Sequence, residues 1–301
     1  MEFEVIIVGG SYAGLQAGMT LGRALRKVLI IDSGKPCNAQ TPHSHNFLTR
    51  DGETPAAITT VALEQLKTYN TVQLLRGKAI KGEKTGHGFA ITTEAGERFT
   101  AKKLIITTGI KDLVPDIPGV AACWGISVIH CPYCHGYEVA HQPTGILGNG
   151  DGGFETVKLI RHWTKDLTLF TNGPLAMSEE MVAQIKRKNI RIIETPVKAI
   201  IHEKGQLSAV ELADGTKVPL KAVYARLPFI QHSDIPAQLG CEFTETGHIK
   251  IADFGKTSVE GVYAAGDNCS MMRGVANAVS AGLAAAAFVN RELIWEEFEQ
   301  V

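Results

Sequence analysis

The stretch EVIIVGGSYAGL, residues 4–15, decides the fold because an apolar run passes directly into a glycine-rich turn. The apolar residues 4–8 predict a buried strand, and a helix is expected from about Ala13 to Leu25. A second apolar run, Val28 to Ile31, predicts the next strand and ends at Asp32. This strand–helix–strand order predicts a βαβ unit, the opening of a nucleotide-binding α/β domain.

The glycine-rich turn has the pattern expected for binding a dinucleotide pyrophosphate. Gly9 permits a tight turn, Gly14 permits close contact between helix and strand, and the helix N-terminus offers free N–H groups. Ser11 stands where the G-x-G-x-x-G pattern has its middle glycine, and we expect Gly10 to supply the missing clearance. Asp32 is placed to accept hydrogen bonds from a ribose. The alternative is an ordinary strand–turn–helix unit with no ligand.

The same supersecondary unit occurs a second time in the chain. Residues 148–153 read GNGDGG, a complete G-x-G-x-x-G pattern. They lie between an expected strand over residues 144–147 and an expected helix over residues 154–163, and another strand is expected over residues 167–170.

Two linker-like zones indicate how these units are combined. One is the proline- and glycine-rich stretch DLVPDIPG at residues 112–119, and the other covers residues 228–240. We therefore predict an α/β fold with two Rossmann-like (three-layer ββα) nucleotide-binding domains, the second inserted into the first. The inserted domain is expected to span residues 114–241, and the first domain to comprise residues 1–113 and 242–301.

The composition excludes several classes of protein. The 301 residues carry a formal net charge of −1, so no overall field favours nucleic acid or an anionic membrane. Hydrophobic residues make up 45% and charged residues 20%, which is typical of packed globular domains. The apolar stretch from Gly274 to Val289 contains Asn277 and is short for a membrane span, so we expect a buried helix. We recognise no signal peptide and expect a cytoplasmic location.

The segment HCPYCHG, residues 130–136, carries the candidate redox pair. Only Cys131 and Cys134, among six cysteines, have a motif spacing, and they can close a disulfide if the segment forms the first turn of a helix. Pro132 suits the first helical position, and the helix N-terminus is expected to lower the thiol pKa of Cys131. Three alternatives remain: structural cysteines, half of a zinc site, and haem attachment. No metal is expected, because no second Cys or His pair stands at zinc-site spacing.

A motif near the C-terminus resembles part of a flavin site. GVYAAGD, residues 261–267, is an expected strand followed by a small-residue helix from about Arg273. It resembles the second FAD motif of the FAD-linked disulfide reductases, in which the aspartate binds the ribityl chain and the helix N-terminus faces the flavin. The strand end TTG at residues 107–109 resembles that family too. The cofactor-contacting positions that this resemblance implies are Gly109, Gly266, Asp267, Gly274 and Val275.

Two FAD motifs, an inserted Rossmann unit and a C-x-x-C just before its glycine-rich turn together resemble thioredoxin reductase over nearly the whole chain. The resemblance implies bound FAD, a homodimer, Cys134 against the isoalloxazine, and Cys131 exchanging with a substrate sulfur. His135 stands where the family has an acidic proton donor, and imidazole can do that work near neutral pH. A structural, solvent-facing His135 is the alternative. The loop TPHSHNF, residues 41–47, would by the same resemblance pass near the flavin. Its histidines His43 and His45 could assist proton transfer, but a structural role in the loop is favoured.

The second nucleotide site departs from the thioredoxin reductase pattern. Where that family has His-Arg-Arg to bind the 2′-phosphate of NADPH, residues 171–173 read TNG. NADPH binding is therefore doubtful, although Arg161, Lys165 or Arg187 could replace the missing cations. No acidic residue takes their place, so a preference for NADH is not evident either.

These features favour an FAD-dependent dithiol–disulfide oxidoreductase that works without NADPH on a small dithiol or a thioredoxin-like protein. The chain resembles a branch of FAD-dependent dithiol oxidases that have a C-x-x-C-H-G-type site and a degraded nicotinamide site; another branch takes electrons from ferredoxin. One alternative is an NADPH-dependent thioredoxin-disulfide reductase. A second, from another class, is a flavoprotein redox sensor without turnover. Nucleic acid and membrane partners are not expected.

Overall fold

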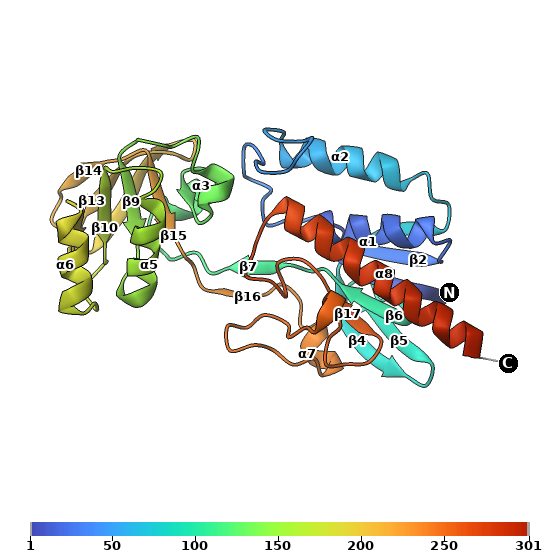
Figure 1. The fold of residues 1–301 in the computed structure, drawn as a ribbon. Helices are drawn as coiled ribbons and strands as arrows, with labels where there is room; N and C mark the ends of the chain where they lie inside the picture. Colours follow the sequence, from blue (N-terminus) through green and yellow to red (C-terminus); the bar gives the residue numbers. More distant parts are fainter. Residues whose placement is uncertain (1, 300–301) are drawn as a thin grey trace. The chain divides into compact units, whose positions relative to one another are not determined.

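The computed structural model describes residues 2–299, which divide into two compact units (Figure 1). The first unit runs to Ala39, continues over Asn46–Lys111 and resumes at Phe229. The second comprises Gln40–His45 and Asp112–Pro228. The chain passes between them through two paired strands, β7 (Ile110–Asp112) and β16 (Phe229–Gln231).

The division differs from the expected one in two places: residues 229–241, expected in the insert of residues 114–241, belong to the first unit, and Gln40–His45, expected in the first domain, belong to the second. Helix α7 (Ile235–Leu239) packs against strand β4 (Ala79–Thr85). The Gly82 N–H donates to Gln238 Oε1 at 2.8 Å, and a Cβ on Gly82 would lie 2.8 Å from Ile235 Cγ2. The second proline- and glycine-containing zone is therefore a packed part of the first unit.

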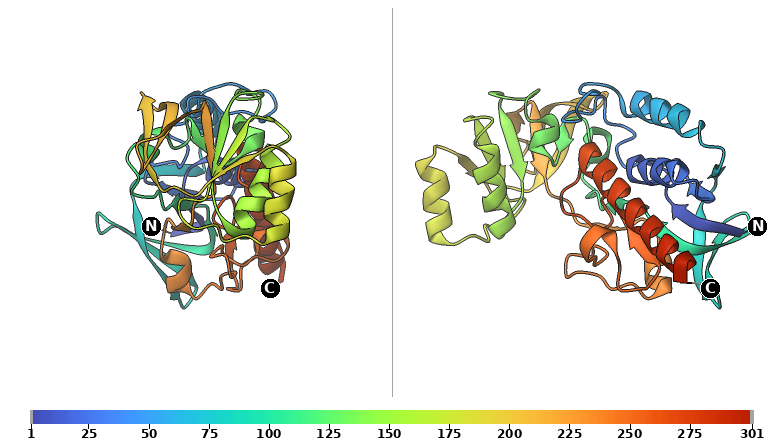
Figure 2. Two further views of the ribbon diagram at one scale, coloured as in Figure 1. Left: turned by 90° about the vertical axis from the view of Figure 1, so that its left-hand side faces the viewer. Right: turned by 45° about the vertical axis from the view of Figure 1, so that its right-hand side comes forward.

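The first unit is built on one sheet with strand order β3-β2-β1-β6-β5-β4, and β17 also pairs with β6. Strands β1, β2, β3, β6 and β17 are parallel, so their carboxyl ends meet at one edge. Helices α1 and α8 lie side by side (Figure 2). The elements are β1 (Glu2–Val8), α1 (Tyr12–Arg23), β2 (Val28–Asp32), α2 (Pro55–Leu66), β3 (Val72–Arg76), β5 (Gly88–Thr93), β6 (Arg98–Ile106), the 3-10 turn Asp253–Gly255, β17 (Val262–Ala264) and α8 (Val275–Glu299).

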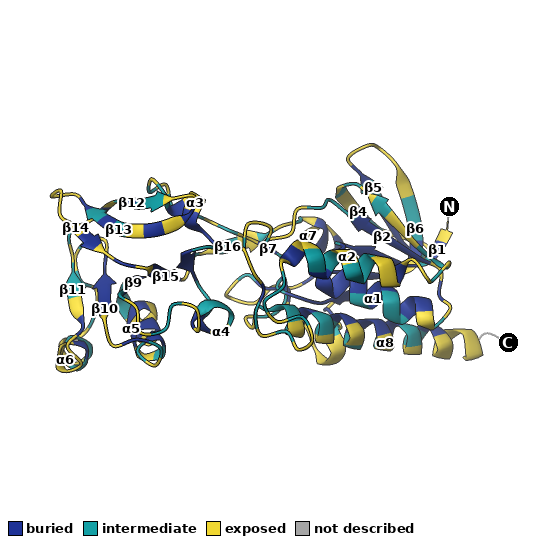
Figure 3. Cartoon of the chain, turned by 90° about the horizontal axis from the view of Figure 1, so that it is seen from above, coloured by how far each residue is buried: buried dark blue, intermediate teal, exposed yellow. Residues whose placement is uncertain are grey.

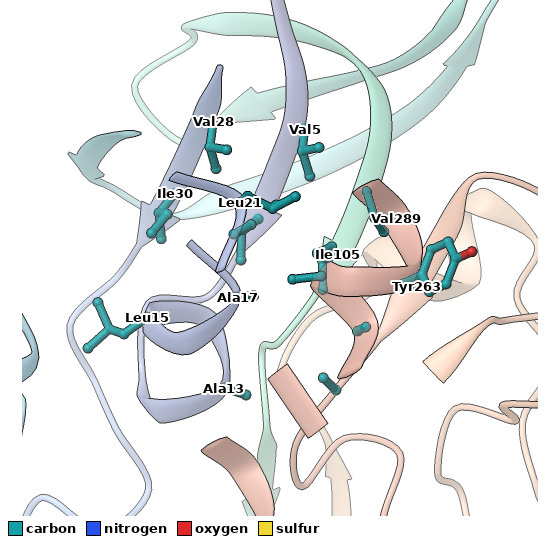
Figure 4. Close-up of a cluster of buried hydrophobic side chains, with 14 of the residues drawn as sticks. Val5, Ala13, Leu15, Ala17, Leu21, Val28, Ile30, Ile105, Tyr263 and Val289 are labelled. Atoms are coloured by element: carbon teal, nitrogen blue, oxygen red, sulfur yellow. The ribbon is translucent and has the colours of Figure 1, made fainter. Parts of the chain in front are cut away.

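Strand β1 divides its side chains between the two faces of the sheet, as alternation along a strand requires. Val5 and Ile7 join the cluster under α1 and α8, whereas Ile6 and Val8 join the cluster on the opposite face. Figure 4 shows the first cluster, in which Leu21 of α1 and other apolar side chains meet. The expected first strand and helix thus form, with the helix ending two residues before Leu25.

The second unit contains a five-stranded parallel sheet of order β11-β10-β9-β15-β8 and a three-stranded antiparallel sheet, β12-β13-β14. Strands β10 and β15 are buried along their whole length, as Figure 3 shows. The elements are α3 (Val120–Cys123), β8 (Val128–Ile129), α4 (Pro132–His135), β9 (Thr144–Leu147), α5 (Gly150–Ile160), β10 (Leu167–Phe170), α6 (Glu179–Arg187), β11 (Arg191–Ile193), β12 (Val197–Glu203), β13 (Gln206–Leu212), β14 (Lys217–Pro219) and β15 (Ala222–Ala225). The α/β fold of two nucleotide-binding units predicted from the sequence is confirmed.

Helix α8 is the expected small-residue helix, and it packs against α1. Across residues 2–299, no helix is both long enough and apolar enough to cross a membrane. Gly282 of α8 has no space for a side chain, since a Cβ there would lie 2.2 Å from the Ala13 carbonyl oxygen. The two helices therefore touch through their backbones.

We predict that Gly282→Ala destabilises the first unit by about 1–3 kcal/mol, because the added methyl forces α8 away from α1. Thermal unfolding followed by circular dichroism should show a melting temperature lower by several degrees. Gly86→Ala is the control, since a Cβ there has no neighbour within 4 Å. Equal melting temperatures for the two variants would refute the backbone contact.

Candidate cofactor and redox site

The first glycine-rich turn is closed by contacts that leave no room for side chains. Gly9 has φ +106°, and a Cβ there would lie 2.4 Å from the Thr107 carbonyl oxygen. A Cβ on Gly14 would lie 1.9 Å from the Gly9 carbonyl oxygen. The Thr107 hydroxyl donates to that same Gly9 oxygen at 2.7 Å. The first turn of α1 is thereby held against the ends of β1 and β6, with its backbone N–H groups open to a ligand.

Gly10 lies directly against Asp32. Its N–H donates to Asp32 Oδ1 at 3.1 Å, and a Cβ on Gly10 would lie 2.7 Å from the Asp32 Cβ. Gly10 thus gives clearance to Asp32, and the clearance expected for a pyrophosphate stays a prediction. Arg76 Nη1 donates to Asp32 Oδ2 at 3.2 Å, while Ser11 is the N-cap residue of α1. The carboxylate is fixed beside the turn, where a ribose would need it.

The second expected motif, residues 261–267, lies at the same carboxyl edge of the first unit's sheet. Gly266 follows β17 with φ +93°, and Gly109 follows β6 with φ +65°. Asp267 accepts a hydrogen bond from Arg273 Nε at 3.3 Å. Gly274 directly precedes α8 and Val275 begins it. The expected positions Gly9, Gly10, Ser11, Gly14, Asp32, Gly109, Gly266, Asp267, Gly274 and Val275 all belong to the first unit, at or after the carboxyl ends of parallel strands.

Two buried polar atoms test whether this edge fits a dinucleotide. Thr108 Oγ1 and Asn268 Oδ1 are buried and have no hydrogen-bond partner among the described residues. Buried polar atoms normally have partners, so orphaned ones beside a glycine cradle fit a polar ligand. Together with the open amides of α1, the residues present suit FAD: Gly9 and Gly14 for the pyrophosphate, Asp32 for the ribose and Asp267 for the ribityl chain.

The redox pair lies directly after β8, at the carboxyl edge of the second unit's parallel sheet. Cys131 and Cys134 form a disulfide with a Cα–Cα distance of 5.3 Å. Cys131 is the N-cap of α4 and Pro132 takes the first helical position. The His135 N–H donates to the Cys131 carbonyl at 3.2 Å, which closes the turn. The segment therefore has the single helical turn that a C-x-x-C disulfide needs.

Three of the four remaining cysteines are poorly suited to thiol chemistry. Burial raises the pKa of Cys123 and Cys241, and burial together with the charge of Asp267 raises the pKa of Cys269 to about 12. The fourth, Cys37, is exposed. Within residues 2–299, no group of three or more His, Cys, Asp or Glu side chains could hold a metal ion.

His135 is half-buried, and burial lowers its pKa, with the negative charge of Glu138 acting in the opposite direction. A neutral imidazole at pH 7 can accept a proton. His45 Nε2 lies 3.4 Å from Glu138 Oε1, within the same unit. Sequence reasoning missed Glu138; the available signal was its position three residues after His135, one turn away if the helix continued.

The second glycine-rich loop is tied to the loop after β10. Asn149 Oδ1 accepts from the Ala176 N–H at 2.9 Å, and Asn149 Nδ2 donates to the Pro174 carbonyl at 2.8 Å. Asn172 has φ +53°, and its Oδ1 accepts from the Val197 N–H at 2.8 Å. Hydrogen bonds of the Asn149 and Asn172 side chains therefore hold residues 171–176 in place.

The three basic residues considered as replacements lie at the other edge of this sheet. Arg161 follows the last turn of α5, roughly 16 Å along the axis from its start. Arg187 ends α6, and Lys165 precedes β10. Because both helices run antiparallel to the strands, these ends face the amino edge, away from the glycine-rich loop.

Comparison with known proteins agrees with the fold and the motifs. The sequence profile of the family described as "Pyridine nucleotide-disulphide oxidoreductase" matches residues 3–282. "Thioredoxin reductase tcpT" of Claviceps purpurea is 31% identical, with 97% of this chain and 94% of that protein covered. An oxidoreductase from Agrobacterium tumefaciens has a TM-score of 0.92 at 32% identity, covering 98% of this chain and 99% of that one. A putative thioredoxin reductase TrxB from Bacillus anthracis has a TM-score of 0.93 at 30% identity, covering 98% and 99%.

We predict that Gly14→Ala weakens flavin binding at least about tenfold, because the turn must open and lose amide contacts with the pyrophosphate. The measurement is bound flavin per chain after dialysis. Gly153→Ala is the matched control, since its Cβ would lie 2.9 Å from Gly148 C in the equivalent turn of the second unit. If Gly14→Ala folds and keeps its flavin as Gly153→Ala does, the assigned cradle is wrong.

Proposed function

The chain belongs to the pyridine nucleotide-disulphide oxidoreductase family and is a thioredoxin reductase-like flavoprotein, and from that premise we propose that it passes electrons from a substrate dithiol to FAD without NADPH. Its substrate is then a small dithiol or a thioredoxin-like protein. The reaction would be that of a dithiol oxidase, with oxygen or another acceptor taking the electrons.

The observation that carries this proposal is the absence of cations from the loops that would hold a 2′-phosphate. The loops after β9, β10 and β11, residues 148–153, 171–178 and 194–196, contain no lysine or arginine in the sequence. They contain Asp151 and Glu194 instead. Each charge-assisted hydrogen bond is worth roughly 1.5–3 kcal/mol, so two missing arginines weaken NADPH binding by about two to four orders of magnitude.

The anchoring of residues 171–176 supports the same conclusion. The basic residues considered as replacements, Arg161, Lys165 and Arg187, all start from the opposite edge of the sheet. Glu194 Oε2 accepts from the Leu175 N–H at 2.9 Å, which adds a negative charge beside the loop. A phosphate there would meet a carboxylate rather than a guanidinium.

The chain's own residues account for the thiol steps of the proposed reaction. A substrate thiolate attacks Cys131 Sγ, the Cys131–Cys134 bond breaks, and Cys134 leaves as a thiolate. The second substrate thiolate attacks the mixed disulfide and releases Cys131. His135 directly follows Cys134 and is kept neutral at pH 7 by its lowered pKa, so it is available to take up a thiol proton. Bound FAD supplies the two-electron acceptor for the reduced pair.

One specific observation favours a second candidate, an NADPH-dependent thioredoxin reductase. The second unit retains a complete G-x-G-x-x-G turn, in which a Cβ on Gly153 would lie 2.9 Å from Gly148 C. Such a turn can hold a pyrophosphate without any 2′-phosphate contact. The two candidates differ in the electron donor and share every thiol step.

Anaerobic mixing separates them. We expect dithiothreitol to bleach the flavin absorbance within the mixing experiment, and NADPH or NADH at equal concentration to reduce it at least about a hundredfold more slowly. The measurement is stopped-flow absorbance of the three mixtures side by side. Rapid bleaching by NADPH would overturn the proposal in favour of the reductase.

The thiol roles have their own test. Cys134→Ser should abolish dithiol oxidation, because no intramolecular disulfide remains to accept two electrons. Cys123→Ala is the control, as it removes a buried thiol of the same unit. Oxygen uptake with dithiothreitol measures both. Unchanged uptake in Cys134→Ser would exclude the pair from the reaction.

A further inference from the structure

The second unit places a carboxylate and a second histidine around His135. We propose that Glu138 is a positioning residue that stabilises the imidazolium formed when His135 takes a proton from the substrate thiol, and that His45 holds Glu138 in place. This inference rests on the proposed function, because it deepens the role of His135 in the thiol step.

The contacts come from two distant parts of the chain. His45 belongs to the segment Gln40–His45, which is part of the second unit although the sequence on both sides of it belongs to the first. His45 Nε2 lies 3.4 Å from Glu138 Oε1, and the two side chains are 22% and 42% exposed. The segment is fixed at its other end too, where Gln40 Nε2 donates to the Trp124 carbonyl. An ion pair of this kind that is open to water can pass a proton on to solvent.

The charge of Glu138 acts on more than one group near the disulfide. It raises the pKa of His135 against the effect of burial, while the charge of His45 lowers it. It also raises the pKa of Tyr224, after burial, which is the larger cause. Tyr224 of β15 is 1% exposed, and its hydroxyl has no hydrogen-bond partner among the described residues. Other titratable side chains of the same region are Tyr133 and Tyr137, on the same segment as His135, and His43, whose ring centroid lies 6.3 Å from that of His45.

This arrangement has a defined part in the thiol step. The substrate S–H proton moves to the His135 ring, and the sulfur electron pair forms a bond to Cys131 Sγ. The Cys131–Cys134 bond breaks, and its electron pair stays on Cys134 as a thiolate. The positive charge on His135 is then balanced by Glu138 until the proton reaches water. Without that carboxylate, half-buried His135 is a weaker base.

The test is the pH dependence of flavin reduction by dithiothreitol under anaerobic conditions. Glu138→Gln keeps an acceptor oxygen for His45 and removes the charge. The rate needs neutral His135, so loss of the carboxylate should move the acid limb of the profile to lower pH by roughly one unit. The plateau rate should fall about tenfold, since a weaker base accepts the proton less readily. Titration of the His135 ring by NMR in the oxidised protein should move in the same direction.

Three variants make the result specific. Glu138→Asp should restore most of the acid limb, whereas Glu155→Gln should leave profile and plateau unchanged, because that carboxylate pairs with Lys158 on α5. His45→Gln combined with Glu138→Gln should be no slower than Glu138→Gln alone if His45 acts only through Glu138. An unshifted profile and an unshifted His135 titration in Glu138→Gln would overturn the inference. Failure of the wild-type flavin to bleach with dithiothreitol would instead overturn the proposed function.

Discussion

The first unit depends on backbone contact around Ala13, where three elements approach too closely for side chains. A Cβ on Gly14 would collide with the Gly9 carbonyl, and one on Gly282 would collide with the Ala13 carbonyl. These contacts hold the start of α1 between the end of β1 and the face of α8. That placement brings the N-terminus of α1 to the edge where Thr108 Oγ1 and Asn268 Oδ1 have no hydrogen-bond partner among residues 2–299, which suits a dinucleotide.

Much of this fold could be predicted from local sequence patterns. The spacing of apolar residues, the positions of glycines and the strand–turn–helix order can all be recognised within short stretches of sequence. The strands over residues 144–147 and 167–170 begin and end where the sequence places them. The helical turn at Pro132 also follows from local preference. By contrast, residues 228–240 are predicted to be linker-like because the packing partner of α7, β4, is far away in the sequence. Proline and glycine mark a turn without telling what the turn packs against.

The same limit explains what sequence reasoning missed at the site. The turn GGSYAG was judged against a pattern for phosphates, whereas Gly10 is required by the Asp32 side chain from the next strand. Glu138 lies just after the HCPYCHG motif but is not part of it, and its partner His45 comes from a segment nearly a hundred residues earlier. Pairings of this kind depend on tertiary contacts that no window of sequence contains.

Motif matching alone would rank the two glycine-rich turns in the wrong order as candidate cofactor sites. By pattern the second turn is the complete one and the first is imperfect, yet the first has open amides and orphaned polar atoms, and the second has its neighbouring loop tied down by Asn149. A glycine pattern reports only that backbone can come close; charge and open hydrogen-bonding groups decide what binds there. Asp151 lies in the second turn and Glu194 directly follows β11, so both place negative charge near the carboxyl ends of that sheet. Burial raises the thiol pKa values of Cys123, Cys241 and Cys269, which makes these cysteines weaker nucleophiles than an exposed thiol. The residues around Cys131 and Cys134 can then alter the rate of the thiol steps by supplying and removing protons.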